Sequence, residues 1–139
     1  MRFADTNIFL YVAASKDSTE REKTTIALAL LDERDLKISA QVLQEFYVQA
    51  TRVTRYGALT HDQAAYLIKS FILRFPVQEI TADLVESALK TARRYRLSYW
   101  DAAIIEAARA AGCNVVLSED LNDDQDYSGV RIHNPFRGK

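Results

Sequence analysis

Short β-prone runs alternate with longer helical patterns along this chain, and that alternation constrains the fold more than any other feature. The runs predicted to form strands are residues 2–4, 36–39, 77–80, 114–118 and 130–133. Strands separated by helical stretches favour parallel pairing, because a parallel connection needs a crossover segment. The run Val115-Val116-Leu117 is continuous enough for a strand that is buried on both faces. The sequence therefore predicts an α/β fold with a largely parallel sheet.

Helices are predicted between these runs, and three of them have a recognisable first turn. A polar side chain is followed three positions later by an acid or an amide, as in a capping box, at Thr19 with Glu22, Thr60 with Gln63 and Ser98 with Asp101. The helices are expected to end near Leu31, Thr54, Arg74, Arg96 and Ala110. Gly112 follows the last of these helices, at a position where glycine favours helix termination.

Size and composition restrict the chain to one domain, residues 1–139. A length of 139 residues with 48% hydrophobic residues suffices for one core and leaves no room for a second. One cysteine excludes an internal disulfide and thiolate metal sites, and two histidines with four glycines exclude a histidine-rich zinc site and glycine-rich phosphate loops. Because the net charge is −1, any affinity for nucleic acid must come from a local patch.

The sequence predicts neither secretion nor membrane insertion. Asp5 precedes any apolar stretch long enough for a signal peptide, and no later apolar run reaches membrane-spanning length. Together with the single cysteine, these features indicate a cytoplasmic protein with no membrane partner.

Asp5 directly follows the first predicted strand and opens the sequence Asp5-Thr6-Asn7. One interpretation is a helix N-cap, a position that aspartate favours. A second interpretation uses the same location, because ligands of an open parallel sheet bind outside the carboxyl ends of its strands. Thr6 and Asn7 would then orient a functional carboxylate.

Asp101 shares one helix face with three apolar residues, Ile104, Ile105 and Ala108, at spacings of i+3, i+4 and i+7. A charge on a buried face costs several kcal/mol unless it is paired, hydrogen-bonded or bound to a metal. A plain capping role with Ser98 is the structural alternative. The apolar companions favour a functional role.

Asp120 follows the predicted strand 114–118, so it is expected at the same sheet edge as Asp5. A solvated acidic turn would also explain this position. Glu119, Asp123 and Asp124 are close enough in sequence to replace or assist Asp120.

Four segments of the chain resemble, in their order and spacing, those of the PIN-domain ribonucleases and, more narrowly, those of the VapC-type toxins of toxin–antitoxin pairs. These segments are Asp5-Thr6-Asn7, Ser98-Tyr99-Trp100-Asp101, Ser118-Glu119-Asp120-Leu121 and residues 130–136. The resemblance covers essentially the whole chain. It implies a three-layer α/β/α fold with a central, mostly parallel sheet of about five strands.

The resemblance also implies a catalytic site. Its metal-binding acids would be Asp5, Glu45, Asp101 and Asp120, with supporting polar roles for Thr6, Asn7 and Ser118. The helical pattern alone predicts Glu45 to be a surface acid. Crowded carboxylates repel one another unless a hard cation such as Mg²⁺ or Mn²⁺ neutralises them. The implied reaction is hydrolysis of RNA by a metal-activated water, giving a 5′-phosphate and a 3′-hydroxyl.

RNA binding would require positive charge near these acids. Arg93, Arg94 and Arg96, interleaved with Tyr95, form the best local candidate, although basic residues at a helix C-terminus also suit the helix dipole. The resemblance further implies a cognate antitoxin as a partner and a second copy of the chain in a homodimer.

Two other functions stay open. A PIN nuclease in RNA processing would need no antitoxin. A receiver-type signalling module would bind Mg²⁺ without catalysis, but Asp5-Thr6-Asn7 and the absence of lysine from residues 91–138 fit such a module poorly.

Overall fold

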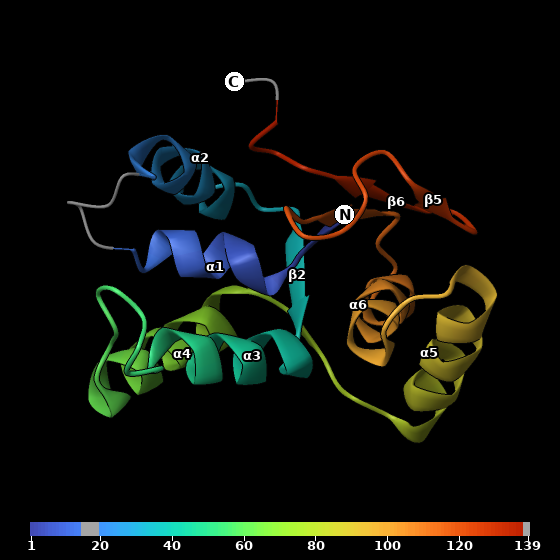
Figure 1. Ribbon diagram of the computed structural model, residues 1–139, viewed down its shortest axis with the longest axis horizontal. Helices are drawn as coiled ribbons and strands as arrows, with labels where there is room; N and C mark the ends of the chain where they lie inside the picture. The colour runs from blue at the N-terminus through green and yellow to red at the C-terminus, as the bar shows by residue number, and fades with distance from the viewer. Residues whose placement is uncertain (15–19, 138–139) are drawn as a thin grey trace.

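Helical stretches separate the first four strands, as the sequence predicts, but each of these stretches consists of two helices, so the described residues contain one helix more than expected (Figure 1). The computed structural model describes residues 1–14 and 20–137. Its strands are β1 (Arg2–Ala4), β2 (Leu36–Ser39), β3 (Val77–Gln78), β4 (Val115–Leu117), β5 (Asp126–Tyr127) and β6 (Val130–His133). Its helices are α1 (Thr6–Val12), α2 (Arg21–Leu31), α3 (Ala40–Ala50), α4 (His61–Arg74), α5 (Ala82–Tyr95) and α6 (Tyr99–Ala110). None of these helices combines the length and the apolar character needed to cross a membrane.

The strands form one sheet in the order β3-β2-β1-β4-β6-β5. Every pairing is parallel except that of β5 with β6, which is antiparallel. The predicted parallel α/β sheet is therefore confirmed, with one strand more than expected. Since β5 has only two residues, Asp126 and Tyr127, it is too short to produce an alternating pattern in the sequence.

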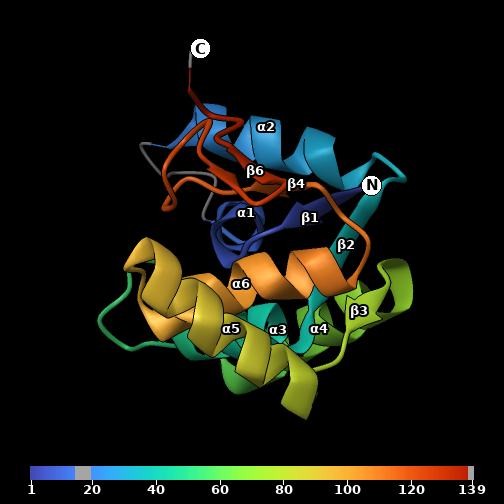
Figure 2. The ribbon, with the colours of Figure 1, turned by 90° about the vertical axis from the view of Figure 1, so that its right-hand side faces the viewer.

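Helices cover both faces of this sheet, which confirms the three-layer architecture. In Figure 2, α2 lies above the sheet, whereas α3, α5 and α6 lie below it. Helix α6 packs against β2, β3, β4 and β6, and α5 packs on the outside of α6. Helix α1, which begins directly after β1, contacts both α2 and α3.

Element boundaries differ from the predictions in a few places. Helix α3 ends at Ala50 rather than near Thr54, because the carbonyl oxygen of Ala50 accepts a hydrogen bond from the backbone N–H of Leu59 at 2.8 Å. Strands β3 and β4 are shorter than predicted and consist of Val77–Gln78 and Val115–Leu117. The predicted cap at Thr19 lies outside the described residues.

The other two predicted helix starts form as hydrogen-bonded caps. Thr60 and Gln63 make a complete capping box, in which each side chain accepts a hydrogen bond from the backbone N–H of the other residue. At α6, the hydroxyl oxygen of Ser98 accepts from the backbone N–H of Asp101 at 3.1 Å. Within the described residues, the Asp101 side chain returns no such bond, so this box is half formed.

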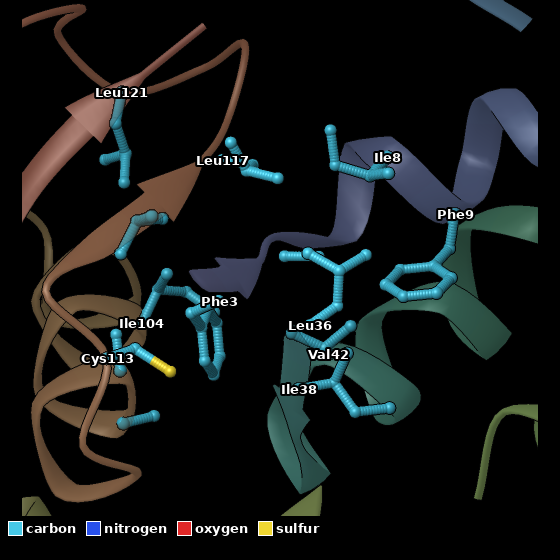
Figure 3. Close-up of a cluster of buried hydrophobic side chains, with 14 of the residues drawn as sticks. Phe3, Ile8, Phe9, Leu36, Ile38, Val42, Ile104, Cys113, Leu117 and Leu121 are labelled. Atoms are coloured by element: carbon cyan, nitrogen blue, oxygen red, sulfur yellow. The ribbon is translucent and has the colours of Figure 1, made fainter. Parts of the chain in front are cut away.

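The core lies between the central strands and the helices on both faces (Figure 3). Phe3 of β1 and Ile38 of β2 are completely buried, as is Phe9 of α1. The Phe9 ring lies 4.7 Å from the ring of Phe71 and 5.8 Å from that of Phe75, measured between centroids. Because these aromatic contacts hold α1 against α4, they also fix the turn that connects β1 to α1.

Replacement of the Phe9 ring should therefore destabilise the whole domain. We expect Phe9→Ala to lower the free energy of unfolding by about 3–5 kcal/mol, because it leaves a cavity among packed aromatic rings. Urea unfolding followed by circular dichroism measures the change. Leu73→Ala is the control, since the Leu73 side chain is 88% exposed and its loss should change stability by no more than about 0.5 kcal/mol. Equal stabilities of the two variants would contradict this description of the core.

Candidate active site

Two polar segments meet at the carboxyl ends of the central strands β1 and β4. Asp5 follows β1, Ser118 follows β4, and the backbone N–H of Asp5 donates to the carbonyl oxygen of Leu117 at 3.0 Å. The chain leaves β1 toward β2 on one side, whereas β4 lies on the other side of β1. This is a topological switch point, where open α/β sheets bind their ligands.

The carboxylate of Asp5 is held by hydrogen bonds on both of its oxygens. Its Oδ1 accepts from the backbone N–H of Thr6 at 2.7 Å, and its Oδ2 accepts from the hydroxyl of Ser118 at 2.8 Å. Asp5 is also the N-cap of α1, so the capping interpretation is correct. The cap is buried at the switch point, which means that a capping role and a functional role are compatible at this residue.

Electrostatic crowding distinguishes Asp5 from an ordinary cap. Burial raises the pKa of Asp5 to about 6, because the charged carboxylate loses contact with water. The negative charges of Glu45 and Asp120 add to this increase in the pKa. The hydrogen bonds from Ser118 and Thr6 oppose the increase but do not cancel it. Glu45 and Asp120, which come from distant segments, therefore lie near enough to Asp5 to affect its ionisation.

Glu45 reaches this point from the middle of α3. The hydroxyl of Thr6 donates to Glu45 Oε1 at 2.8 Å, and Nε2 of Gln41 lies 3.4 Å from Glu45 Oε2. The helical pattern predicts a surface acid, and Glu45 is indeed partly exposed, but its carboxylate also bonds to the start of α1. Its partner Thr6 is 39 positions away in the sequence, so the pattern of one helix does not reveal the contact.

Asn7 connects Asp120 to the same cluster. Nδ2 of Asn7 lies 3.3 Å from both Asp120 Oδ2 and Ser118 Oγ. Oδ1 of Asn7 accepts from the backbone N–H of Glu119 at 3.2 Å. The backbone N–H of Asp120 donates to Ser118 Oγ at 3.2 Å. Asn7 and Ser118 thus fix the loop that presents Asp120.

The acids next to Asp120 have other partners. Glu119 forms an ion pair with Lys23 of α2 and accepts from the hydroxyl of Tyr11 at 2.5 Å. Burial opposes ionisation of Glu119, but these bonds and the charge of Lys23 hold its pKa below the ordinary value. The carboxylate of Asp123 accepts from the backbone N–H of Asn134 at 2.8 Å. Asp120 is therefore the acid of this run whose carboxylate bonds to Asn7.

Asp101 lies in the first turn of α6. Residues Ala102–Ala108 of this helix are all buried, including the three apolar residues predicted to share a face with Asp101, but Asp101 itself is half-buried because it stands where the helix begins. Burial raises the pKa of Tyr127, and the negative charge of Asp101 contributes to that increase. In the part of the chain that the structure describes, no hydrogen bond joins Asp101 to Asp5, Glu45 or Asp120.

The donor set suits a hard divalent cation with open coordination positions. Over residues 1–14 and 20–137, no group of three or more acidic, histidine or cysteine side chains is arranged so that it could hold a metal ion. Mg²⁺ does not require one, because it usually binds through one or two carboxylates and keeps waters or substrate phosphates as its other ligands. Burial and, to a smaller extent, the charges of Glu45 and Asp120 raise the pKa of Asp5, and such a cation would offset both effects. The residues present therefore fit Mg²⁺ or Mn²⁺ in their chemistry.

Sequence reasoning missed one residue of this region. Gln41 is 6% exposed, and its Nε2 lies 3.4 Å from Glu45 Oε2 and 3.1 Å from the backbone carbonyl oxygen of Trp100. It therefore connects the start of α3 with the start of α6. The signal that would have found it is its position one helical turn before Glu45.

The predicted RNA-binding arginines lie near the junction of α5 and α6. Arg93 and Arg94 are in the last turn of α5, Arg96 follows with a left-handed backbone at φ 56°, and all three are exposed. The guanidinium of Arg94 lies 5.2 Å from the centre of the Tyr95 ring. Their contact with RNA stays a prediction.

Comparison with known proteins supplies independent information. The PIN domain family matches residues 2–125 of the chain. No curated protein matches the chain. The crystal structure of the Mycobacterium tuberculosis toxin VapC20, described as cleaving the Sarcin-Ricin loop, is similar to this chain, with 22% identity and a TM-score of 0.66. That similarity covers 86% of this chain and 90% of the toxin.

Two further structures have the same fold. A toxin–antitoxin complex from Klebsiella pneumoniae has 20% identity and a TM-score of 0.65, covering 97% of this chain and 98% of its own. DNA-bound VapBC from Salmonella typhimurium has 19% identity and a TM-score of 0.64, covering 96% and 97% of the two chains. At these identities, the structures establish the fold alone.

The raised pKa of Asp5 predicts how stability depends on pH in the metal-free protein. An acid whose pKa rises on folding, here to about 6, destabilises the folded state when it is ionised. The free energy of unfolding should therefore fall as the pH rises from about 4 to above 6. Asp5→Asn should be more stable than the unmodified chain at about pH 8, by up to about 3 kcal/mol, and similar to it near pH 4.

Urea unfolding in EDTA over this pH range measures both quantities. Glu79→Gln, which removes an exposed carboxylate between β3 and α5, is the control and should differ from the unmodified chain by a constant amount. If the stability difference between Asp5→Asn and the unmodified chain is also constant over this pH range, the interpretation of Asp5 is refuted.

Proposed function

Because the chain belongs to the PIN domain family, we propose that it is an endoribonuclease that depends on Mg²⁺ or Mn²⁺ and acts as the toxin of a type II toxin–antitoxin pair. The main support is the convergence of Glu45 and Asp120 on the buried Asp5 at the switch point of the sheet. The printed descriptions of the similar structures, a loop-cleaving toxin and a toxin–antitoxin complex, agree with this assignment.

Four acids would hold the cation: Asp5, Glu45, Asp101 and Asp120. When bound, the cation supplies Lewis-acid chemistry, which lowers the pKa of water and stabilises negative charge on the phosphate. Asp101 belongs to this set by family resemblance, and its half-buried carboxylate has no ion-pair partner among the described residues. Hydrolysis by water would leave a 5′-phosphate and a 3′-hydroxyl.

Three neutral side chains orient the acids for this task. Ser118 donates to Asp5, Thr6 donates to Glu45, and Asn7 donates to Asp120. Hydrogen bonds of this kind restrict the rotation of a carboxylate while its remaining lone pairs stay available to a cation. Thr6, Asn7 and Ser118 therefore act as positioning residues.

Substrate and protein partners complete the proposal. Arg93, Arg94 and Arg96 would contact phosphates of the RNA on the approach to the acids. A cognate antitoxin would bind the protein and suppress its activity, and the chain would form a homodimer. The protein would act in the cytoplasm, where its RNA substrate is found.

Cleavage of RNA should depend on both the acids and the cation. We expect Asp5→Asn, Asp101→Asn and Asp120→Asn each to lower kcat on total cellular RNA in Mg²⁺ by about 100-fold or more, because each removes a negative ligand from the site. Excess EDTA should abolish cleavage by the unmodified chain. Gel analysis of the RNA, with mapping of the product ends, measures these effects.

Asp124→Asn is the matched control for Asp120→Asn. Asp124 lies in the same loop with a left-handed backbone at φ 65°, which asparagine also tolerates. This variant should retain nearly full activity. Vigorous cleavage in EDTA, or full activity of the Asp5 variant, would refute the metal-dependent mechanism.

A toxin should also arrest growth in a way that a partner relieves. We expect expression of the unmodified chain to stop bacterial growth, whereas the Asp5→Asn variant should not, because it lacks the site that cleaves RNA. Co-expression of an adjacent small gene should restore growth, and its product should co-purify with the chain. RNA cleavage in vitro without growth arrest would instead assign the chain to RNA processing.

A further inference from the structure

A groove runs along the outer face of α3, beside the first turn of α6. Its volume is about 340 Å³, which is within the range of pockets that hold small ligands. Its lining consists of Gln41, Gln44, Glu45, Val48, Gln49, Arg52 and Trp100. Figure 2 shows α3 and α6 on the same side of the sheet, so residues far apart in the sequence form the two walls.

The groove is continuous with the acidic site. Glu45 lines the groove and also accepts the hydrogen bond from Thr6 within the acidic cluster. Gln41 bridges the two walls, since its Nε2 lies near Glu45 Oε2 and donates to the carbonyl oxygen of Trp100. A polymer with one phosphate at the acids would therefore place its neighbouring unit over the groove.

Apolar surface in the groove is concentrated at Trp100 and Val48. The Trp100 side chain is 63% exposed, and Val48 is 55% exposed. The ring of Tyr99 packs edge-on against the indole of Trp100, with centroids 5.1 Å apart and planes inclined at 82°. The indole therefore has a neighbour that restricts its rotation while most of its surface faces solvent.

Polar groups of the groove have unused hydrogen-bonding capacity. The side-chain amides of Gln44 and Gln49 make no hydrogen bond within residues 1–14 and 20–137, and each offers both a donor and an acceptor. Arg52 is exposed and has no acidic partner in the same part of the chain. The groove thus combines an aromatic surface, paired donors and acceptors, and one cation.

We propose, on the basis of the nuclease function above, that this groove binds one nucleobase of a single-stranded RNA beside the phosphate at the acidic site. The base stacks on Trp100, because an aromatic side chain is the usual stacking surface for an unpaired base. Gln44 and Gln49 hydrogen-bond to the base edge, and Arg52 contacts the adjoining phosphate. The groove therefore confers a base preference at a fixed position next to the cleaved bond.

A nucleobase suits this lining better than an apolar protein segment. Covering Gln44, Gln49 and Arg52 with apolar side chains would remove their water without supplying partners, which costs free energy at each polar group. A base edge and a phosphate supply those partners. The stacking surface and the polar groups are then satisfied by one ligand.

Fluorescence tests this binding directly, because Trp100 is the single tryptophan of the chain. The full-length Asp5→Asn variant is titrated with a ten-nucleotide single-stranded RNA and, separately, with an abasic oligomer of the same length and charge. Stacking should quench the emission with the RNA but not with the abasic oligomer. Equal quenching by both, or no quenching by either, would overturn the assignment of the groove.

Kinetics on the otherwise unmodified chain provide a second test. Trp100→Ala should raise KM for RNA about fivefold or more with little change in kcat, which is the loss expected for one stacked base. Trp100→Phe should restore most of the affinity, because phenylalanine retains a stacking surface. Tyr66→Ala, which removes an aromatic side chain that is 71% exposed on α4, is the matched control and should leave KM unchanged. An unchanged KM in Trp100→Ala would overturn the proposal.

Sequencing of the product ends tests whether the groove recognises the identity of the base. The double variant Gln44→Ala/Gln49→Ala should alter the base frequencies at one position beside the cleaved bond and leave the other positions unchanged. Unaltered frequencies at every position would refute a base-reading role for the groove.

Light scattering distinguishes a nucleobase site from a protein interface. If Trp100→Ala or Arg52→Ala converts a dimer of the chain into monomers, the groove is an interface between copies and the proposal fails. An unchanged oligomeric state together with the raised KM supports it. Absence of cleavage by the unmodified chain would refute the proposed nuclease function, whereas the fluorescence titration would still decide the role of the groove.

Discussion

The parallel pairing of β1 with β4 at the centre of the sheet is the constraint on which the rest of the structure depends. This pairing places Ala4 beside Leu117, so the residues that follow the two strands emerge side by side. Asp5 and Ser118 are 113 positions apart, yet their side chains are 2.8 Å apart. Both strands are buried and the strand order changes direction between them, so polar groups can gather outside an otherwise apolar core.

The residues that stabilise the fold are different from the acids that repel one another at the switch point. Hydrophobic packing of Phe3, Phe9 and Ile38 stabilises the domain and brings α1 and α3 into place. The acids at the switch point oppose that stability, since burial and mutual repulsion raise the pKa of Asp5. A site that is electrostatically unfavourable when empty is suited to binding a cation, because the cation removes the repulsion on arrival.

Features that depend on local pattern were predictable from the sequence, as was the shared sheet edge of Asp5 and Asp120, whereas side-chain contacts between distant helices were not. The runs that became β1, β2 and β6 have the expected bounds, and the cap at Thr60 forms as its residue types indicate. The partner of Glu45 and the bridge made by Gln41 depend on how helices pack, which periodicity along one helix does not report. The different roles of Glu119 and Asp120 likewise depend on distant partners. Lys23 and Tyr11, which bond to Glu119, are 96 and 108 positions away from it in the sequence.

Ser118 orders the loop that follows β4 through its side-chain hydrogen bonds. Its hydroxyl has a single hydrogen, and the carboxylate of Asp5 takes it. The oxygen therefore offers only lone pairs to Asn7 and to the backbone N–H groups of Asp120 and Leu121. By accepting this hydrogen, the carboxyl group of Asp5 sets the direction of the other hydrogen bonds at Ser118, and it thereby orders the backbone of the loop that follows β4.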